Sequence, residues 1–490
     1  MASPMSDANL AVPLASEDPA SRIGRQFQEC IVDVPEHGLS EQSSPSSFNP
    51  DDETKNYDIE RVQPSRKLGF CSKYFEQTRW NALKTFGISI LVMGTLLIGI
   101  HSIFWGSLFQ REKYLNRVNF FLVNFDSNAD SIIGSTFLSS ASRYAMAAGS
   151  ATVQDETSIY ASGNIDAVYK DVVEEKNWGA FVVLPNATAK LIAALKEPSG
   201  AAEYHSDLVQ FVYAQAREPS VYDSLMPWIS GLSASFTSEL SNELLRLTMN
   251  NSDYSASKIV NQAPYLLSTP ATVLLTNIRP MDNPVTGAIM QLGLVHLIIL
   301  SFFQFDFFQQ VHKSFFPYLK RRHFLIYRTL LSLAAYFFLS LFFSLLSLAF
   351  QVDFTRAYGR GGFVVFWMIM FLGMTAVGGA SENIALICVA TYPPLVGFWL
   401  IFMVISNSSP AFYSIELEAS FFKYGYAFPI HNVAEAFKTV LFNTKSNIGL
   451  NVGVLLAWIA DNTAFAPFSI WIFERANNWK ESKKIKVERS

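Results

Sequence analysis

Cysteine is scarce in this sequence, with only three among 490 residues: Cys30, Cys71 and Cys388. None of them lies in the long polar segment at residues 109–286, so no disulfide bond can stabilise a domain formed by that segment. The sequence therefore excludes a disulfide framework for that segment.

Motifs for bound nucleotide, metal or covalent catalysis are also missing. The chain has no Gly-x-x-x-x-Gly-Lys-Ser/Thr loop to cradle nucleotide phosphates, no His-Glu-x-x-His and no Gly-x-Ser-x-Gly. Its seven histidines are scattered, and they form no metal-spaced cluster with the cysteines. We therefore expect no enzyme activity, no cofactor and no metal. The formal net charge is −4, so the chain has no excess of basic residues with which to bind nucleic acid. We therefore do not expect nucleic acid as a partner.

Long apolar runs dominate what is present. Half of the residues are hydrophobic, and a helix that crosses a bilayer needs about 20 predominantly apolar residues. Six runs meet that length: Leu83–Leu108, Gly287–Phe307, Leu325–Phe350, Gly362–Gly379, Ile384–Ile405 and Gly449–Phe473. Only residues 380–383 separate the fourth run from the fifth, which predicts a tight hairpin there. The predicted fold class is an α-helical polytopic membrane protein with six transmembrane helices, one before and five after an inserted α+β domain.

Lys and Arg gather before the first run, between the second and third, and after the sixth. With six spans, all three clusters lie on one side of the membrane, and such clusters mark the cytosolic side. We therefore expect both termini in the cytosol, residues 109–286 on the lumenal or exterior side, and membrane lipids as partners of the clusters. Arg328 belongs to the second cluster, whereas Arg356 and Arg360 are exceptions on the other side. The expected location is the plasma membrane or an endomembrane.

These boundaries divide the chain into five parts. Residues 1–65 are rich in Ser, Pro and acidic residues and are predicted to be a disordered cytosolic tail. The other parts are a basic juxtamembrane segment with the first span at 66–108, the exterior domain at 109–286, a five-helix transmembrane domain at 287–473 and a basic cytosolic tail at 474–490.

The exterior segment has the pattern of an independent α+β domain. Trp178–Pro185 predicts a buried strand, with helical spacing before it at residues 166–176. Asn186-Ala187-Thr188 then predicts the cap of a further helix.

Two more helices are predicted in this domain, at residues 204–218 and 222–249. The apolar face of the second is expected to pack on the domain's own sheet or in a coiled-coil-like pair. Asn186 and Asn250 each begin an N-glycosylation sequon, which fits an exterior location.

A partly polar stretch at residues 406–448 separates the last two apolar runs. It is too polar for a span, and residues 433–442 have the spacing of a short amphipathic helix. We interpret it as a hairpin on the exterior side of the membrane, with four candidate residues: Pro410, Pro429, His431 and Asn432.

The sixth run carries small residues at every fourth position, at Gly449, Gly453 and Ala457, and the series ends at Asp461. Small residues allow helices to approach closely, so the stripe predicts helix packing or dimerisation.

Asp461 falls near the middle of that run, where a carboxylate is costly and normally faces protein or water. His296 in the second run is the best candidate partner, with Asn462 and Gln291 as neutral alternatives. Two roles stay open for this candidate intramembrane site. It is either a polar site for substrate contact or proton coupling, or a structural carboxyl that holds two helices together.

These stretches support a resemblance to a known family. Trp178-Gly179-Ala180-Phe181-Val182-Val183-Leu184-Pro185-Asn186-Ala187-Thr188, and Tyr426-Ala427-Phe428-Pro429-Ile430-His431-Asn432 with Gly449-Leu450-Asn451-Val452-Gly453, resemble the fungal nitrosoguanidine-resistance family. The wider arrangement over residues 80 to 475 resembles type-2 ABC-transporter permeases with an inserted exterior domain.

The resemblance implies a membrane protein that contributes to resistance to toxic compounds, by export or by altering membrane lipid distribution. Because the chain lacks a nucleotide-binding loop, a permease would depend on a separate ATPase or a gradient. The alternative is a scaffold or stress-response regulator that keeps the permease fold and binds another membrane protein or a second copy of itself.

Overall fold

The computed structural model describes residues 76–109, 111–126, 131–148, 151–160, 163–251, 254–316 and 318–488. The predicted acidic tail at residues 1–65 and the basic residues at 66–75 lie outside them. The chain divides into two compact units, Met1–Thr78 and Arg79–Ser490, and every contact below lies within the second.

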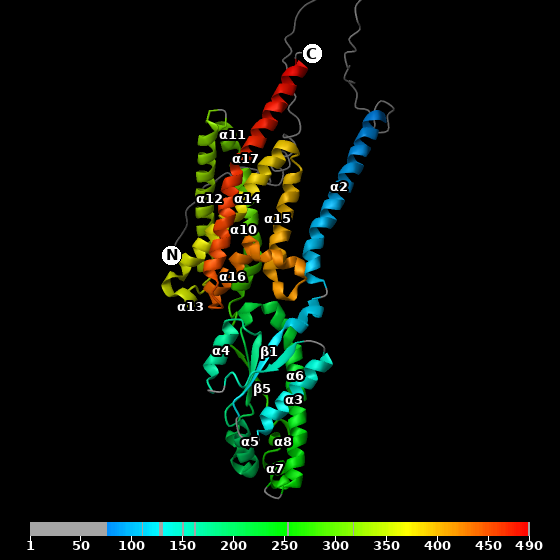
Figure 1. The fold of residues 1–490 in the computed structure, drawn as a ribbon, viewed down its shortest axis with the longest axis vertical. Coiled ribbons are helices and arrows are strands. Elements are labelled where there is room, and N and C mark those ends of the chain that lie inside the picture. The colour runs from blue at the N-terminus through cyan, green and yellow to red at the C-terminus, as the bar shows by residue number, and fades with distance from the viewer. Residues whose placement is uncertain are drawn as a thin grey trace, which may run out of the picture. The chain divides into compact units, whose positions relative to one another are not determined.

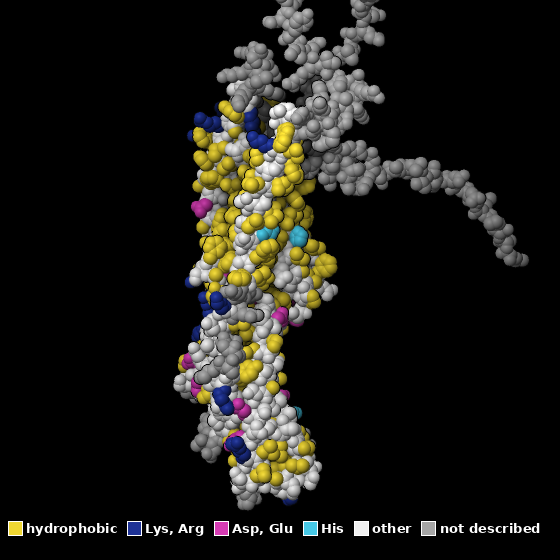
Figure 2. All heavy atoms as spheres, turned by 90° about the vertical axis from the view of Figure 1, so that its right-hand side faces the viewer, with side chains coloured by type: hydrophobic (Ala, Val, Ile, Leu, Met, Phe, Trp, Pro, Cys, Tyr) yellow, Lys and Arg dark blue, Asp and Glu magenta, His cyan; other side chains and the backbone are white. Residues whose placement is uncertain are grey.

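Among the described residues, six helices are long and apolar enough to cross a membrane, which confirms the predicted number of candidate spans. Figure 2 shows hydrophobic side chains gathered over these helices, while Lys and Arg lie mainly toward their ends and over the sheet domain. The six candidate spans are Trp80–Leu108, Pro284–Phe307, Arg321–Ala349, Thr355–Thr391, Leu395–Phe412 and Ile448–Lys480.

A five-stranded mixed sheet follows α2 (Glu76–Leu108) in the chain (Figure 1). Its strand order is β2-β1-β3-β4-β5, and only the β3–β4 pair is antiparallel. The strands are β1 (Asn119–Asn124), β2 (Thr152–Asp155), β3 (Gly179–Val183), β4 (Val209–Tyr213) and β5 (Val273–Asn277).

Helices cover both faces of this sheet, because successive strand side chains point to opposite faces. Phe181 and Val183 pack into the larger core, whereas Ala180 and Val182 face the smaller one. The larger core is closed by α3 (Ile132–Ala148), α5 (Ala187–Lys196), α6 (Pro219–Asn250), α7 (Ala256–Gln262) and α8 (Tyr265–Ser268), and the smaller one by α4 (Ile165–Val173). Short 3-10 helices η2 (Arg111–Arg117), η3 (Pro198–Glu203) and η4 (Gln215–Arg217) connect these elements.

The strand and helices predicted within this domain are confirmed except at residues 204–218, while its exterior location stays a prediction. Trp178–Pro185 contains β3, whose five residues are all buried. Asn186 stands at the N-cap position of α5, but its side chain forms no capping hydrogen bond. The apolar face of α6 packs on its own domain, with Leu232 and Phe236 fully buried. The predicted helix at residues 204–218 is wrong, because strand pairing of the apolar run Val209–Tyr213 overrides its helical spacing.

The spans after the sheet pack around α14 (Gly362–Thr391), the most buried of them. Close approach depends on glycines, since a Cβ on Gly373 would lie 2.6 Å from Val433 Cγ2 and one on Gly379 would lie 3.1 Å from Asn462 Cβ. The neighbours of α14 are α10 (Leu294–Phe307), α12 (Arg321–Ala349), α15 (Leu395–Phe412), α16 (Pro429–Phe442) and α17 (Ile448–Glu488).

The tight hairpin predicted at residues 380–383 is wrong. The chain stays helical through Glu382 and turns only at residues 392–394, where Pro393 and Pro394 lack the backbone N–H groups that would continue the helix. Polar residues in the run therefore mark a buried surface within one long helix, and α14 exceeds the predicted run by twelve residues at its C-terminal end.

Short elements complete this half of the chain. The second span starts as α9 (Pro284–Ala288) and a π-helical turn at η5 (Ile289–Gly293) before α10. The remaining pieces are α11 (Gln309–Phe315), α13 (Thr355–Tyr358), η6 (Gly359–Gly361), η7 (Ile415–Leu417) and η8 (Ser420–Ala427).

Candidate functional site

A buried ion pair lies between two membrane-length helices. Arg328 Nε on α12 donates to Glu382 Oε2 on α14 over 3.3 Å, and both side chains are about nine-tenths buried. Arg328 lies about two turns inside its helix, and Glu382 about two and a half turns before the end of its own. Charges at such positions are costly, and they normally pair with each other or face a cavity.

The second carboxylate oxygen of Glu382 is bound from the same helix as Arg328. Tyr336 Oη donates to Glu382 Oε1 over 2.7 Å, and it also lies 3.3 Å from Gln304 Oε1 on α10. Gln304 Nε2 in turn donates to Ser332 Oγ. Three helices therefore share one polar network around a single carboxylate.

Hydrogen bonds from two asparagines, Asn383 and Asn462, join a fourth helix, α17, to α14 next to this network. Asn383 Nδ2 donates to the backbone oxygen of Asn462 over 2.9 Å, and Asn462 Nδ2 donates to Ala376 O over 2.8 Å. The two amides bridge α14 and α17 one residue away from Glu382.

A cavity of about 100 Å³ opens onto this network. Its walls come from α12, α14 and α17, with Arg328, Tyr336, Glu382 and Asn462 among them. The space suits water or one small polar group, and it places a charged carboxylate and a phenol hydroxyl at a cavity inside the spans. We name Arg328, Glu382, Tyr336 and Gln304 the intramembrane cluster.

Sequence reasoning missed this cluster for two reasons. It assigned Glu382 to a hairpin between spans, and it counted Arg328 in a basic loop cluster, whereas both lie inside long helices. The available signal was the spacing of Ser332, Tyr336 and Ser340, which places polar side chains on one face of an otherwise apolar run together with Arg328.

The predicted intramembrane site is only partly assembled. Asn462 lines the cavity, but Asp461 is exposed and forms no hydrogen bond or ion pair with any residue that the structure describes. His296 is also exposed, with Nδ1 2.7 Å from Leu292 O in its own helix, and Gln291 is exposed on η5. Consecutive residues face different sides of a helix, so Asn462 points to α14 while Asp461 points outward.

The small-residue stripe also faces outward. Gly449, Gly453 and Ala457 are exposed, and no atom lies within 4 Å of a Cβ built on either glycine. Within the described part of the chain, the stripe therefore packs against no other span. Its use in dimerisation stays a prediction.

A second polar cavity, of about 290 Å³, lies where the sheet domain meets the segment between α15 and α17. Arg217 at the end of η4 is buried there, with its guanidinium carbon 3.8 Å from the ring centre of Trp178. Arg217 Nη2 donates to Glu416 Oε2 over 3.0 Å, and Nη1 donates to Asn177 O over 2.8 Å. We name this space the junction cavity.

Paired charges line the other side of the junction cavity. Lys438 on α16 lies 2.8 Å from Glu435 Oε1 and 3.7 Å from Glu218 Oε2 of the sheet domain. Burial raises the pKa of Glu175. Burial opposes the charged form of Lys438, but Glu435 and Glu218 raise the pKa of this lysine and keep it protonated.

The four residues predicted for the hairpin lie close to the junction cavity. His431 and Asn432 line it, and His431 Nδ1 donates to Pro410 O over 3.0 Å. Burial lowers the pKa of His431, which favours the neutral imidazole. Pro429 occupies the first turn of α16, where a missing N–H costs nothing, whereas Pro410 lies inside α15. The predicted amphipathic segment 433–442 is confirmed as part of α16.

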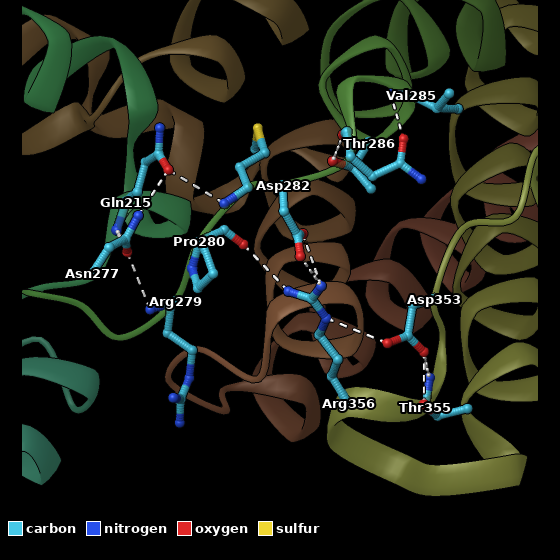
Figure 3. Close-up of polar contacts among 12 residues, drawn as sticks. Gln215, Asn277, Arg279, Pro280, Asp282, Val285, Thr286, Asp353, Thr355 and Arg356 are labelled. Carbon is cyan, nitrogen blue, oxygen red and sulfur yellow. Dashed lines mark hydrogen bonds and ion pairs between the residues drawn. The ribbon is translucent and has the colours of Figure 1, made fainter.

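Arg356 ties the segment that follows β5 to the spans (Figure 3). Arg356 Nη2 lies 2.8 Å from both oxygens of Asp282, its Nη1 donates to Pro280 O, and its Nε lies 3.4 Å from Asp353 Oδ2. Arg356 is an exception to the prediction that basic residues lie on the cytosolic side, and the structure shows that its charge is paired with the nearby carboxylates of Asp282 and Asp353. Arg360 is exposed nearby.

Both predicted glycosylation residues are exposed. Asn186 has a positive φ of 56° and lies before α5, and Asn250 ends α6. Glycan attachment at either position stays a prediction.

The chain is a multi-pass membrane protein, and comparison with known proteins identifies its family. Residues 89–464 match the family described as "Protein of unknown function (DUF3533)", and the chain belongs to that family. It is 30% identical, over 457 residues, to a Saccharomyces cerevisiae protein described as an uncharacterized endoplasmic reticulum membrane protein. The match covers 89% of each chain. No solved structure matches the chain.

Proposed function

We propose that this protein is a permease-like membrane protein that moves an amphipathic compound or lipid and thereby contributes to resistance to toxic compounds. The observation that carries the proposal is the intramembrane cluster. An Arg–Glu pair with a tyrosine hydroxyl at a cavity between spans is expensive to insert, and such groups typically mark substrate or proton pathways. The earlier resemblance to nitrosoguanidine-resistance proteins and type-2 ABC permeases is part of this proposal.

The proposed arrangement has one span before the sheet domain and five after it, with both termini in the cytosol. The three basic clusters support this orientation. The sheet domain and the junction cavity then lie on the lumenal side, and the location proposed from the yeast relative's description is the endoplasmic reticulum membrane.

The cluster offers a chemical role that fits transport. A proton or a cationic group that binds Glu382 would compete with Arg328 and Tyr336 for the same carboxylate, so occupation of the cavity would weaken contacts among α12, α14 and α10. We propose Glu382 as the group that contacts substrate or proton, in place of Asp461. No enzymatic step is required.

Flux measured with purified protein in sealed vesicles tests the proposal. A fluorescent phospholipid analogue and a cationic amphiphilic dye are the two cargoes, each with and without a pH gradient. We expect the wild type to raise the flux of at least one cargo, and Arg328→Gln combined with Glu382→Gln to abolish that increase at equal protein content. Asp461→Asn is the matched control and keeps the flux. Equal flux in empty vesicles and in vesicles with the wild type contradicts an autonomous permease.

A scaffold is the second candidate function, because two apolar helix faces pack against no other span in the part of the chain that the structure describes. The α2 residues Leu91 and Ile98 are about 70% exposed, and the α17 stripe faces away from α14. Copurification from detergent extracts separates the two functions. A stoichiometric soluble ATPase supports an ATP-driven permease, whereas repeated recovery of one other membrane protein without an ATPase supports the scaffold.

A further inference from the structure

A third cavity, of about 230 Å³, lies at the basic end of the spans, between α10, α11, α12, α14 and α17. Phe305, Phe316, Phe324 and Phe473 contribute apolar walls, and no Asp or Glu is among the described residues that line it. Lys480 lies at its exposed side. The cavity therefore combines an apolar interior with cationic groups.

Two buried polar side chains on this cavity lack hydrogen-bond partners among the described residues. Both ring nitrogens of His312 are unpaired although the residue is only 5% exposed. Arg328 Nη2 is also unpaired, while its Nε holds Glu382. A buried donor without a partner is destabilising, and a bound ligand that carries oxygen atoms would supply the missing acceptor.

We propose that this cavity binds the acidic headgroup of a membrane lipid, with phosphate oxygens on Arg328 and His312 and the start of an acyl chain between the phenylalanines. The cations select a negative headgroup over a zwitterionic one, because no lining carboxylate meets the positive part of a zwitterion. This end is cytosolic in the orientation proposed above, on which this step rests, and basic pockets between spans on that side bind acidic headgroups. The volume is below the roughly 300–1,000 Å³ of pockets that enclose whole small molecules, so part of the lipid stays in the bilayer.

The state of His312 is compatible with this role. Burial, followed by the nearby Arg328 guanidinium, lowers the pKa of His312 to about 4, so its imidazole is neutral at pH 7. A neutral ring still has one N–H to donate to a phosphate oxygen. The ring is held edge-on to Phe324 and Tyr327, at centroid distances of 6.4 and 5.8 Å.

Binding of defined lipids to the purified full-length protein tests the inference independently of any flux. The protein is placed in phosphatidylcholine nanodiscs, and retention of added phosphatidate, phosphatidylserine, oleate or inorganic phosphate is measured by native mass spectrometry. We expect saturable retention of phosphatidate at one site, weaker retention of oleate, and none of inorganic phosphate alone. Equal retention of phosphatidate and added labelled phosphatidylcholine overturns the proposal.

Variants outside the intramembrane cluster locate the site. His312→Phe is expected to weaken phosphatidate binding about tenfold, since a hydrogen bond to a charged group is lost. Lys480→Gln is expected to weaken it several-fold. His323→Phe and Lys320→Gln, on exposed positions at the same end, are the matched controls and leave binding unchanged.

The same variant also checks that the fold is intact. Because His312 has two unpaired buried nitrogens, His312→Phe is expected to leave the thermal midpoint of the lipid-free protein unchanged or to raise it. Unchanged phosphatidate retention in His312→Phe and Lys480→Gln, with the fold intact, rules this cavity out as the binding site.

Discussion

Arg217 stacks on Trp178 with its guanidinium carbon 3.8 Å from the ring centre, while it binds Glu416 of the segment after α15. This one side chain therefore joins two stretches that are about 240 residues apart in the sequence. Their proximity indicates that the sheet domain and the hairpin act as one structural unit.

Arg217→Lys is the most direct test of that unit. Lysine keeps the charge but loses the planar stack and the two separate donors, so we expect a loss of about 1–3 kcal/mol in stability. The measurement is thermal unfolding of the purified protein in detergent. Arg246→Lys, an exposed arginine on α6, is the control and changes nothing. An equal, small effect of both substitutions would show that the stack does not couple the two parts.

Gly378 tests the close contact that supports the intramembrane cluster. A Cβ at this position would collide with Tyr336 Oη, which binds Glu382. We expect Gly378→Ala to displace Tyr336, to cost about 1–3 kcal/mol and to reduce the amount of folded protein in the membrane. Gly397→Ala is the matched control, because its Cβ meets no atom within 4 Å. Fluorescence-detected size-exclusion chromatography measures both, and equal profiles would refute the contact's importance.

The sequence predicted the number of candidate spans and much of the sheet domain, because those features follow from local apolar patterns. The strand at Trp178–Pro185 is an example, and the short amphipathic helix that ends at Phe442 follows from the same kind of pattern. It could not predict which polar residues meet, since that depends on helix rotation. Asp461 and Asn462 are neighbours in sequence, yet only Asn462 reaches α14.

The continuous helix through Glu382 shows the same limit. A run of Ala-Ser-Glu-Asn in an apolar context indicates a turn when hydropathy alone is considered. The ion pair with Arg328 allows the Glu382 carboxylate to lie inside a helix between spans. A partner about fifty residues away in the sequence cannot be found from local hydropathy. Tertiary pairing therefore allows α14 to continue through Glu382.

Asp282 provides a pH test at the junction between sheet and spans. The hydrogen bond from Arg356 lowers the pKa of Asp282, so its ionised form is favoured in the folded protein. A lowered pKa contributes stability above the unfolded-state value, ~3.9, and that contribution disappears as pH falls through the folded-state value. We expect the thermal midpoint to fall below about pH 4, and to fall less steeply in Asp282→Asn. Asp223→Asn, at an exposed position on α6, keeps the wild-type slope.

Glycan attachment tests the proposed orientation. Asn186 and Asn250 are exposed in the sheet domain, so a lumenal location makes both accessible to the transferase. We expect glycosidase to increase the gel mobility of the wild type, and Asn186→Gln combined with Asn250→Gln to remove that shift. Protease treatment of sealed vesicles provides the independent readout, and digestion of the sheet domain from the cytosolic side would reverse the orientation.

A double-mutant cycle tests whether the ion pair between Arg328 and Glu382 stabilises the fold or is an incidental contact. Removal of one partner leaves an uncompensated buried charge, which typically costs about 3–5 kcal/mol, whereas removal of both leaves none. We therefore expect Arg328→Gln and Glu382→Gln each to lower the thermal midpoint strongly, and the double variant to recover much of the loss. The coupling is measured as a double-mutant cycle in one detergent at one pH. Arg321→Gln with Glu474→Gln, a more exposed pair at 3.6 Å, is the matched cycle and is expected to show coupling below about 1 kcal/mol. Additive losses at Arg328 and Glu382 would mean that the two charges are stabilised by other groups, and the intramembrane cluster would then lose its central pair.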